Sequence, residues 1–273
     1  MKYFWICPIF VKNVPACLGV ALKQYAFMKS DAVIIIPTYN EKENIEKMIR
    51  VLMALEHSFD VLVVDDGSPD GTAAIVKSLQ GEFAGRVHII EREGKLGLGT
   101  AYITGFKWSL QQGYEYIFEM DADFSHNPAD VPLLYEACAK DGYDLSIGSR
   151  YVTGVNVVNW PMGRVLMSYF ASKYVRFITG LPVYDTTAGF NCYRRKVLET
   201  IDLDSIRFKG YAFQIEMKFT THMCGFKIKE IPVIFVNRVL GTSKMSGGIF
   251  SEALFGVVKL KVGSWFKKYP KNQ

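Results

Sequence analysis

Short apolar runs alternate through the first half of the chain with segments whose apolar residues recur every three or four positions. Runs rich in β-branched residues predict strands, and the three-to-four spacing predicts amphipathic helices. The predicted strands are residues 32–36, 60–64, 86–90, 114–120 and 144–148. The predicted helices are residues 41–55, 70–79, 99–112 and 128–140, with Asn127 as the N-cap of the last. Repeated strand–helix units predict an α/β fold with a mostly parallel sheet flanked by helices on both faces.

The pattern changes after residue 150. Residues 162–179 mix apolar and aromatic side chains with basic ones, which predicts an amphipathic helix. A strand is predicted at 188–193, a helix at 213–223 and an extended segment at 226–236. Residues 249–266 predict a terminal helix that is too polar to span a membrane, and that either packs on the sheet or lies in a membrane interface.

Three parts are expected along the chain. Residues 1–29 are basic, without an acid, and their apolar core is interrupted by Pro8 and Pro15. They form an N-terminal extension ahead of a working start at Met28, a poor signal peptide or an interfacial anchor. Residues 30–244 form one large domain, and residues 245–273 form a C-terminal amphipathic, membrane-associating segment.

Charge divides the chain into two halves. Residues 1–150 hold 14 Lys and Arg against 20 Asp and Glu, whereas residues 151–273 hold 18 against 7. An acidic half suits metal ions, and a basic half suits phosphates or an anionic membrane surface; a basic face turned to solvent is the alternative. The five cysteines include no CxxC pair, which argues against a disulfide framework or a zinc knuckle and favours a reducing, cytosolic setting.

Polar segments follow four of the predicted strands. They are residues 37–41, 65–67, 121–123 and 149–150. Ligands of open α/β sheets bind beyond the carboxyl ends of the strands, so these four segments are expected to converge on one edge of the sheet.

Two carboxylates one residue apart, Asp121 and Asp123, follow a predicted buried strand. Oxygen ligands of this kind hold Mg²⁺ or Mn²⁺ and often share the ion with substrate phosphates. Ser125 adds a hydroxyl two residues later, and loop capping is the alternative role of the pair. A second such pair, Asp202 and Asp204, follows no strand and is predicted to be solvated surface.

The basic half supplies charges that would stabilise a departing nucleotide diphosphate. Arg150 follows a predicted strand, and Arg238 and Lys244 lie in a polar, glycine-containing segment. The glycines of residues 94–100 match neither a Walker A loop nor a Rossmann fingerprint, so they are predicted to form a turn and the start of a helix. The four histidines form no catalytic constellation, although His126 lies close to Asp123 in the sequence.

Taken in order, these segments resemble the dolichol-phosphate (polyprenol-phosphate) mannose synthases, which belong to the inverting family-2 glycosyltransferases of GT-A (Rossmann-like) fold. The resemblance runs from about residue 32 to residue 244. The matching segments are IPTYNE at 36–41, VDDGSPDGT at 64–72, KLGLGTAY at 95–102, MDADFSH at 120–126, GSRY at 148–151, GF at 189–190, GYAFQIE at 210–216 and RVLGTSK at 238–244.

The resemblance implies a role for each matching residue. The guanine nucleotide would be held by Pro37, Tyr39, Glu41, Val64 and Asp66. The diphosphate would be bound through Mg²⁺ or Mn²⁺ by Asp121, Ala122 and Asp123, with Ser125 at a third metal-side position where some relatives have Gln. Phosphates would be bound by Arg150, Arg238 and Lys244, and the acceptor phosphate by Arg150 together with Arg164 and Ser168, which lie four apart on one helical face. Asp123, Arg150 and Arg238 would carry catalysis.

The implied reaction moves mannose from GDP-mannose to a polyprenyl (dolichyl) phosphate with inversion. Such a phosphate is largely dianionic near neutrality and is already a nucleophile, so no general base is needed. Part of the family has a membrane-spanning C-terminal region. Without one, the enzyme would bind the cytoplasmic side of a membrane peripherally, or through a small membrane subunit, and no nucleic acid is expected as a partner. The candidate contacts are the helix around residues 164–176 and the segment 245–273, where Trp265 and Phe266 precede Lys267 and Lys268.

Two other functions remain open from the sequence. Transfer of glucose or another sugar from a UDP donor to the same kind of lipid would use the same fold and metal site. A non-catalytic module that binds a lipid phosphate or a nucleotide is the third hypothesis, and the intact Asp121–Asp123 pair argues against it.

Overall fold

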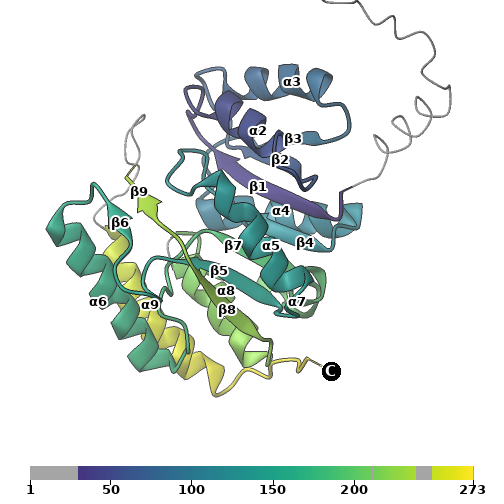
Figure 1. Cartoon of the computed structure of the whole chain (residues 1–273). Coiled ribbons are helices and arrows are strands. Elements are labelled where there is room, and N and C mark those ends of the chain that lie inside the picture. The colour runs from purple at the N-terminus through teal and green to yellow at the C-terminus, as the bar shows by residue number, and fades with distance from the viewer. Residues whose placement is uncertain (1–29, 211, 238–247, 273) are drawn as a thin grey trace, which may run out of the picture. The chain divides into compact units, whose positions relative to one another are not determined.

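The structure is a computed structural model, and it describes residues 30–210, 212–237 and 248–272. The described residues from Asp31 onward form one compact unit, built around a seven-stranded sheet with the strand order β3-β2-β1-β4-β7-β5-β8 (Figure 1). The strands are β1 (Ala32–Thr38), β2 (Asp60–Asp65), β3 (Val87–Glu91), β4 (Tyr116–Glu119), β5 (Leu145–Ser149), β7 (Asn191–Arg194) and β8 (Ile228–Pro232). Only β7 runs antiparallel to its two neighbours, so the predicted mostly parallel sheet is confirmed.

Strand β1 shows why helices cover both faces. Successive side chains of a strand point to opposite faces, and every residue from Ala32 to Ile36 is fully buried. Ala32, Ile34 and Ile36 pack beneath helices α2 (Ile45–Met53), α3 (Thr72–Glu82) and α5 (Val131–Ala139). Val33 and Ile35 pack against α4 (Leu98–Gln112), α7 (Arg195–Thr200) and α8 (Ala212–Met223). Gly105 allows α4 to approach the sheet, since a Cβ there would come within 2.7 Å of the Ile35 side chain.

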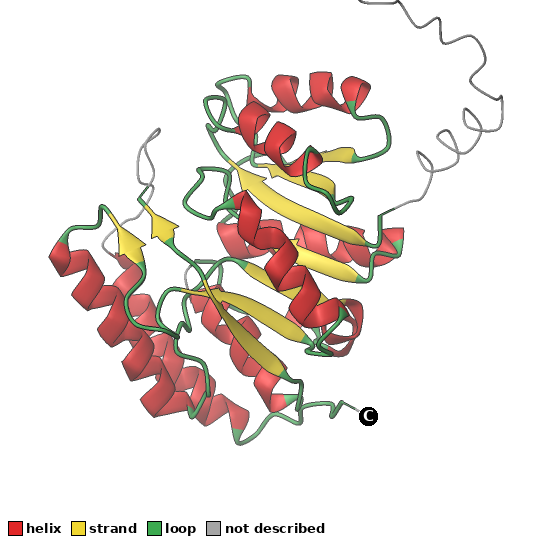
Figure 2. Ribbon diagram, viewed as in Figure 1, coloured by secondary structure: helices red, strands yellow, loops and turns green. Residues whose placement is uncertain are grey.

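Most predicted elements occur at or near their expected positions (Figure 2). Asn127 does cap the short 3₁₀ turn η1 (Pro128–Asp130) ahead of α5, because its side-chain oxygen accepts the Ala129 N–H at 3.1 Å. The extended segment at 226–236 is divided into β8 and β9 (Phe235–Val236), and β9 pairs with β6 (Val157–Val158) in a separate two-stranded sheet. A further 3₁₀ turn, η2 (Leu203–Ser205), contains Asp204, whose exposed carboxylate forms an ion pair with Lys107.

Helices α6 (Met162–Thr179) and α9 (Gly248–Ser264) lie side by side beyond the β5–β8 end of the sheet (Figure 1). Val175 of α6 and Val257 of α9 are buried together with Ile215 of α8, and the Lys261 ammonium donates to the Thr179 carbonyl at the end of α6. The terminal helix therefore packs with one face against helices α6 and α8.

The described residues also bear on membrane-spanning helices and on the state of the cysteines. None of the helices among them is long and apolar enough to cross a membrane. The cysteines within these ranges are Cys138, Cys192 and Cys224, and all three are buried free thiols.

Candidate active site

The carboxyl ends of β1, β2 and β4 meet at one edge of the sheet. The Thr38 hydroxyl donates to Asp65 at 2.7 Å, and the Asp66 N–H donates to the Thr38 carbonyl at 2.9 Å. The Met120 N–H donates to the Ile35 carbonyl at 3.2 Å. Since Tyr39, Asp66 and Asp121 directly follow these linked ends, the structure brings together three of the segments that were predicted to converge.

The residues predicted to hold the nucleotide occupy different positions at this edge. The half-buried Pro37 and Tyr39 lie at the end of β1 and just beyond it, and the Lys95 ammonium lies 5.4 Å from the centre of the Tyr39 ring. Glu41 begins the α2 region, where its carboxylate accepts the Asn44 side-chain N–H at 3.1 Å. The Val64 side chain is fully buried in the core, so only its backbone reaches the strand end.

Asp66 is held by Arg92, a residue that the sequence analysis missed. The Arg92 guanidinium donates from Nε to Asp66 Oδ1 at 2.6 Å and from Nη1 to Thr100 at 2.8 Å. Both side chains of the Arg92–Asp66 ion pair are less than a tenth exposed. A charge-assisted pair of this kind fixes the Asp66 carboxylate against the glycine-containing segment ahead of α4, where Gly97 accepts a further Arg92 N–H.

Asp121 and Asp123 lie on a tight loop after β4. Asp123 is buried, and its Oδ1 accepts the Ser125 N–H at 3.0 Å. Phe124 adopts the left-handed conformation, with φ of 59°; this is unusual for a bulky residue, and strained backbone of this kind concentrates at functional sites. Within the described ranges, no three His, Cys, Asp or Glu side chains gather as a metal-binding group. Two hard carboxylates at the edge that would receive a diphosphate fit a divalent ion that completes its shell with phosphate oxygens.

His126 packs against the Asp121–Asp123 loop. Its ring stacks on Phe190, with ring centres 5.1 Å apart, and meets Phe235 edge-on at 5.3 Å. Burial lowers the pKa of His126 to about 4, so the ring is neutral near pH 7. Its Nδ1 accepts the Asp121 N–H at 3.5 Å, a long contact that places the neutral ring under the loop as a packing group.

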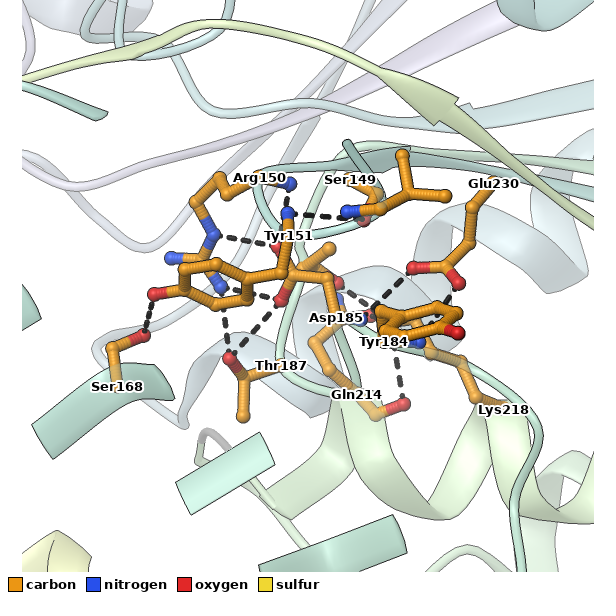
Figure 3. A network of polar contacts seen from close by, with 12 residues as sticks. Ser149, Arg150, Tyr151, Ser168, Tyr184, Asp185, Thr187, Gln214, Lys218 and Glu230 are labelled. Carbon is orange, nitrogen blue, oxygen red and sulfur yellow. Dashed lines mark hydrogen bonds and ion pairs between the residues drawn. The ribbon is translucent and has the colours of Figure 1, made fainter. Parts of the chain in front are cut away.

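Arg150, which directly follows β5, forms an ion pair with Asp185 (Figure 3). The guanidinium donates from Nε at 2.7 Å and from Nη2 at 2.6 Å to the two oxygens of the carboxylate, and the Arg150 N–H donates to it at 2.9 Å. Nη2 also donates to Thr187 at 2.9 Å. Burial alone would raise the pKa of Asp185, but the Arg150 charge and hydrogen bonds hold it below its ordinary value. The pair therefore stays ionised near neutrality.

A second carboxylate holds the turn that carries Asp185. Glu230 of β8 accepts the backbone N–H groups of Tyr184 and Asp185 at 2.7 and 2.9 Å (Figure 3). The chain of contacts from Glu230 through Asp185 to Arg150 joins β8, the 184–187 turn and β5. The position of the Arg150 guanidinium is thus set by residues far from it in the sequence.

The acceptor residues predicted on α6 lie near Arg150. Ser168 accepts the Tyr151 hydroxyl at 2.7 Å (Figure 3). The Arg164 guanidinium donates to the Asn237 side chain at 3.0 Å and lies 3.9 Å from the centre of the Trp160 ring. Arg150 lies 5.5 Å from the same ring. The structure therefore brings Arg150, Arg164 and Ser168 into one region, whereas Arg238 and Lys244 lie outside the described residues.

A fully buried polar layer lies next to the Asp121–Asp123 loop. Glu119, two residues before Asp121, accepts the Asn191 side-chain N–H across the β4–β7 pair. Asn191 also donates to Gln214 at 2.9 Å, and the Lys218 ammonium donates to the Ala188 carbonyl at 2.6 Å. Burial raises the pKa of Glu119 and lowers the pKa of Lys218. This layer connects β4, which precedes the Asp121–Asp123 loop, to α8.

Comparisons with known proteins identify the family of the chain. The model of glycosyl transferase family 2 matches residues 33–202. The chain is 46% identical over 233 residues, 85% of this chain and 86% of the relative, to a polyprenol monophosphomannose synthase of Mycolicibacterium smegmatis. It is 48% identical over 225 residues, 82% of this chain and 91% of the relative, to an undecaprenyl-phosphate mannosyltransferase of Micrococcus luteus.

Solved structures confirm the fold. A glucosyl-3-phosphoglycerate synthase of Mycobacterium tuberculosis, in complex with Mn²⁺, UDP and glucosyl-3-phosphoglycerate, superposes with a TM-score of 0.61 at 16% identity, covering 95% of this chain and 86% of that one. The same enzyme with Mn²⁺ and UDP-glucose gives a TM-score of 0.60, covering 95% and 85%. The GT-A fold predicted from the sequence is thereby confirmed. Because the family model matches more than half of this chain, the chain belongs to glycosyltransferase family 2.

Proposed function

We propose that this protein transfers mannose from GDP-mannose to a polyprenyl monophosphate, releasing GDP and forming a β-mannosyl phosphate lipid. The observation that carries the proposal is the shared edge of the sheet, where the Asp121–Asp123 loop follows β4 and Arg150 follows β5. The two mannosyltransferase relatives, at 46% and 48% identity over more than four fifths of this chain, support the sugar and the lipid.

The donor would lie over the ends of β1, β2 and β4. Tyr39, Glu41 and the Asp66–Arg92 pair would face the nucleoside, and Asp121 and Asp123 would hold Mg²⁺ or Mn²⁺ against the diphosphate. A bound divalent ion would supply charge stabilisation for the GDP leaving group. The Mn²⁺ in the structural relatives with UDP ligands supports a divalent ion at this site.

The acceptor phosphate would lie between Arg150, Arg164 and Ser168. Arginine recognises phosphate through planar, charge-assisted hydrogen bonds. A phosphate oxygen would attack C1 of mannose from the side opposite GDP, so one C–O bond forms as the other breaks and the anomer inverts. Because the phosphate dianion carries no proton that must be removed, the neutral His126 is not required as a base.

The membrane contact would be the joint outer surface of α6 and α9. Exposed apolar side chains recur along α6 at Met162, Leu166, Phe170 and Phe177. They recur along α9 and just beyond it at Phe255, Val258, Val262, Trp265 and Phe266. An apolar patch on two adjoining helices, with exposed Lys173, Lys259 and Lys268 nearby, suits insertion into an anionic lipid interface. Arg164 and Ser168 lie on the same helix, on the side that faces Tyr151 and Asn237 within the domain.

Replacing Phe170 and Phe177 together by serine should weaken binding to phosphatidylcholine–phosphatidylglycerol vesicles by at least about tenfold, because two exposed rings would no longer be buried in lipid. Co-sedimentation of the full chain with vesicles measures the effect. Leu133→Ser is the matched control, since Leu133 is exposed on α5 at the opposite face of the sheet. Unchanged vesicle binding by the double variant, or an equal loss in the control, would move the membrane contact elsewhere.

The donor sugar is tested by supplying GDP-mannose and UDP-glucose in parallel with a polyprenyl phosphate and analysing the lipid products. We expect mannosyl phosphate lipid from GDP-mannose, at a kcat/KM at least about a hundredfold above that for UDP-glucose, because a site built to bond guanine leaves polar groups unpaired with uracil. Glucose transfer at the higher rate would favour the UDP-glucose alternative. Binding of both substrates without any transfer would favour a non-catalytic module.

A further inference from the structure

Trp160 lies close to both arginines of the proposed acceptor site. The Arg164 guanidinium carbon lies 3.9 Å from the centre of the Trp160 ring, and that of Arg150 lies 5.5 Å from it. Phe235 of β9 meets the Trp160 ring edge-on at 5.2 Å and lies 5.5 Å from the Arg150 guanidinium carbon. Two cations are therefore arranged around one aromatic ring, and tryptophan is the aromatic residue that attracts a cation most strongly.

The small β6–β9 sheet holds the Trp160 ring in place relative to the Asp121–Asp123 loop. The Val236 N–H donates to the Ser125 carbonyl at 3.2 Å, and the Asn237 N–H donates to the Val158 carbonyl at 3.0 Å. Asn237 in turn accepts from Arg164 at 3.0 Å. The sheet thus connects the loop after β4, which carries Asp121 and Asp123, with the start of α6.

We infer that Trp160 is a positioning residue for the acceptor phosphate: its ring holds the Arg150 and Arg164 guanidinium groups at a fixed separation and orientation. Two guanidinium groups in one region repel each other before the phosphate dianion arrives, and Asp185 offsets only part of this by pairing with Arg150. Contact with the ring offsets part of that repulsion and restricts the rotamers of both side chains, so less freedom is lost when the phosphate binds. The inference rests on the proposed function, because it assumes that the two arginines receive the lipid phosphate.

A series of variants at Trp160 tests the role. Trp160→Met removes the ring and keeps a large apolar side chain; we expect the KM for polyprenyl phosphate to rise about tenfold, with the KM for GDP-mannose unchanged within about twofold. Trp160→Phe keeps a weaker aromatic face and should raise the acceptor KM only about threefold. Trp108→Met is the matched control, since Trp108 lies on α4 against His88 and Tyr114, and its acceptor KM should not change.

The readouts separate this inference from the proposed function. If the unaltered protein transfers no sugar to polyprenyl phosphate, the proposed function fails. If it does transfer mannose but Trp160→Met leaves the acceptor KM unchanged, or raises both KM values equally, the positioning role is overturned. If Trp160→Met unfolds at the assay temperature, the Trp160→Phe variant tests the positioning role instead. A rise in the acceptor KM alone supports the role, and an unchanged acceptor KM rejects it.

Discussion

Replacing Asp123 by asparagine is expected to lower kcat by about a thousandfold, the loss typical when charge stabilisation of a transition state is removed. Asparagine keeps a side-chain oxygen that can accept the Ser125 N–H, now at 3.0 Å from Asp123 Oδ1, so the shape of the buried loop is retained. The negative charge that would hold a divalent ion is lost. Initial rates at saturating GDP-mannose, with Mg²⁺ or Mn²⁺ in excess, measure the effect, and thermal unfolding checks that the fold is intact.

The chain contains its own control for this experiment. Asp202 and Asp204 repeat the Asp-x-Asp spacing, but Asp204 is exposed and forms an ion pair with Lys107 at the surface. Asp204→Asn should leave kcat unchanged, since exposed ion pairs contribute little. Asp123→Ala, which also removes the hydrogen bond to Ser125, should be no more active than Asp123→Asn. Full activity in either Asp123 variant would refute the metal role.

The strands and helices could be predicted because their patterns are local. Residues 32–36 of β1 and 61–64 of β2 are continuous buried apolar runs, and α2 carries Ile45, Met48, Ile49 and Leu52 on its buried side. The antiparallel direction of β7 could not be predicted, since the sequence of a short buried strand is compatible with either direction. Its direction appears only in the three-dimensional pairing, which places Asn191 opposite Glu119 and Tyr193 opposite Ile117.

The site could be predicted only where its residues are neighbours in the chain. Asp121 and Asp123 form a motif because they lie two positions apart after a strand. Arg92 lies 26 residues from Asp66, and Asp185 lies 35 residues from Arg150. A single acid or arginine at such a separation has no spacing that distinguishes it from a solvated side chain, so both partners were missed. Trp160 and Phe235 were missed for the same reason, since only the β6–β9 pairing brings them together.

Replacing Asp185 by alanine is expected to lower the free energy of unfolding by about 3–5 kcal/mol at pH 7, because it leaves the buried Arg150 cation without its counter-charge. The lowered pKa of Asp185 means that its contribution to stability is present above the ordinary carboxyl pKa and is lost as the pH falls through the lower value in the folded state. The difference between the two proteins should therefore narrow below about pH 4. Urea unfolding at several pH values measures it.

Asp185→Asn serves as the milder variant if the alanine protein does not fold. It keeps the shape and one hydrogen-bond acceptor for Arg150 but removes the charge, so we expect a loss of about 1.5–3 kcal/mol with the same pH dependence. Glu199→Ala is the matched control: Glu199 pairs with Arg195 at 2.6 Å on the surface of α7, and its loss should cost less than about 1 kcal/mol at any pH. If the Asp185 variants cost no more than this control, Arg150 would not depend on Asp185 for its place in the site. The acceptor phosphate would then have to order that guanidinium as it binds.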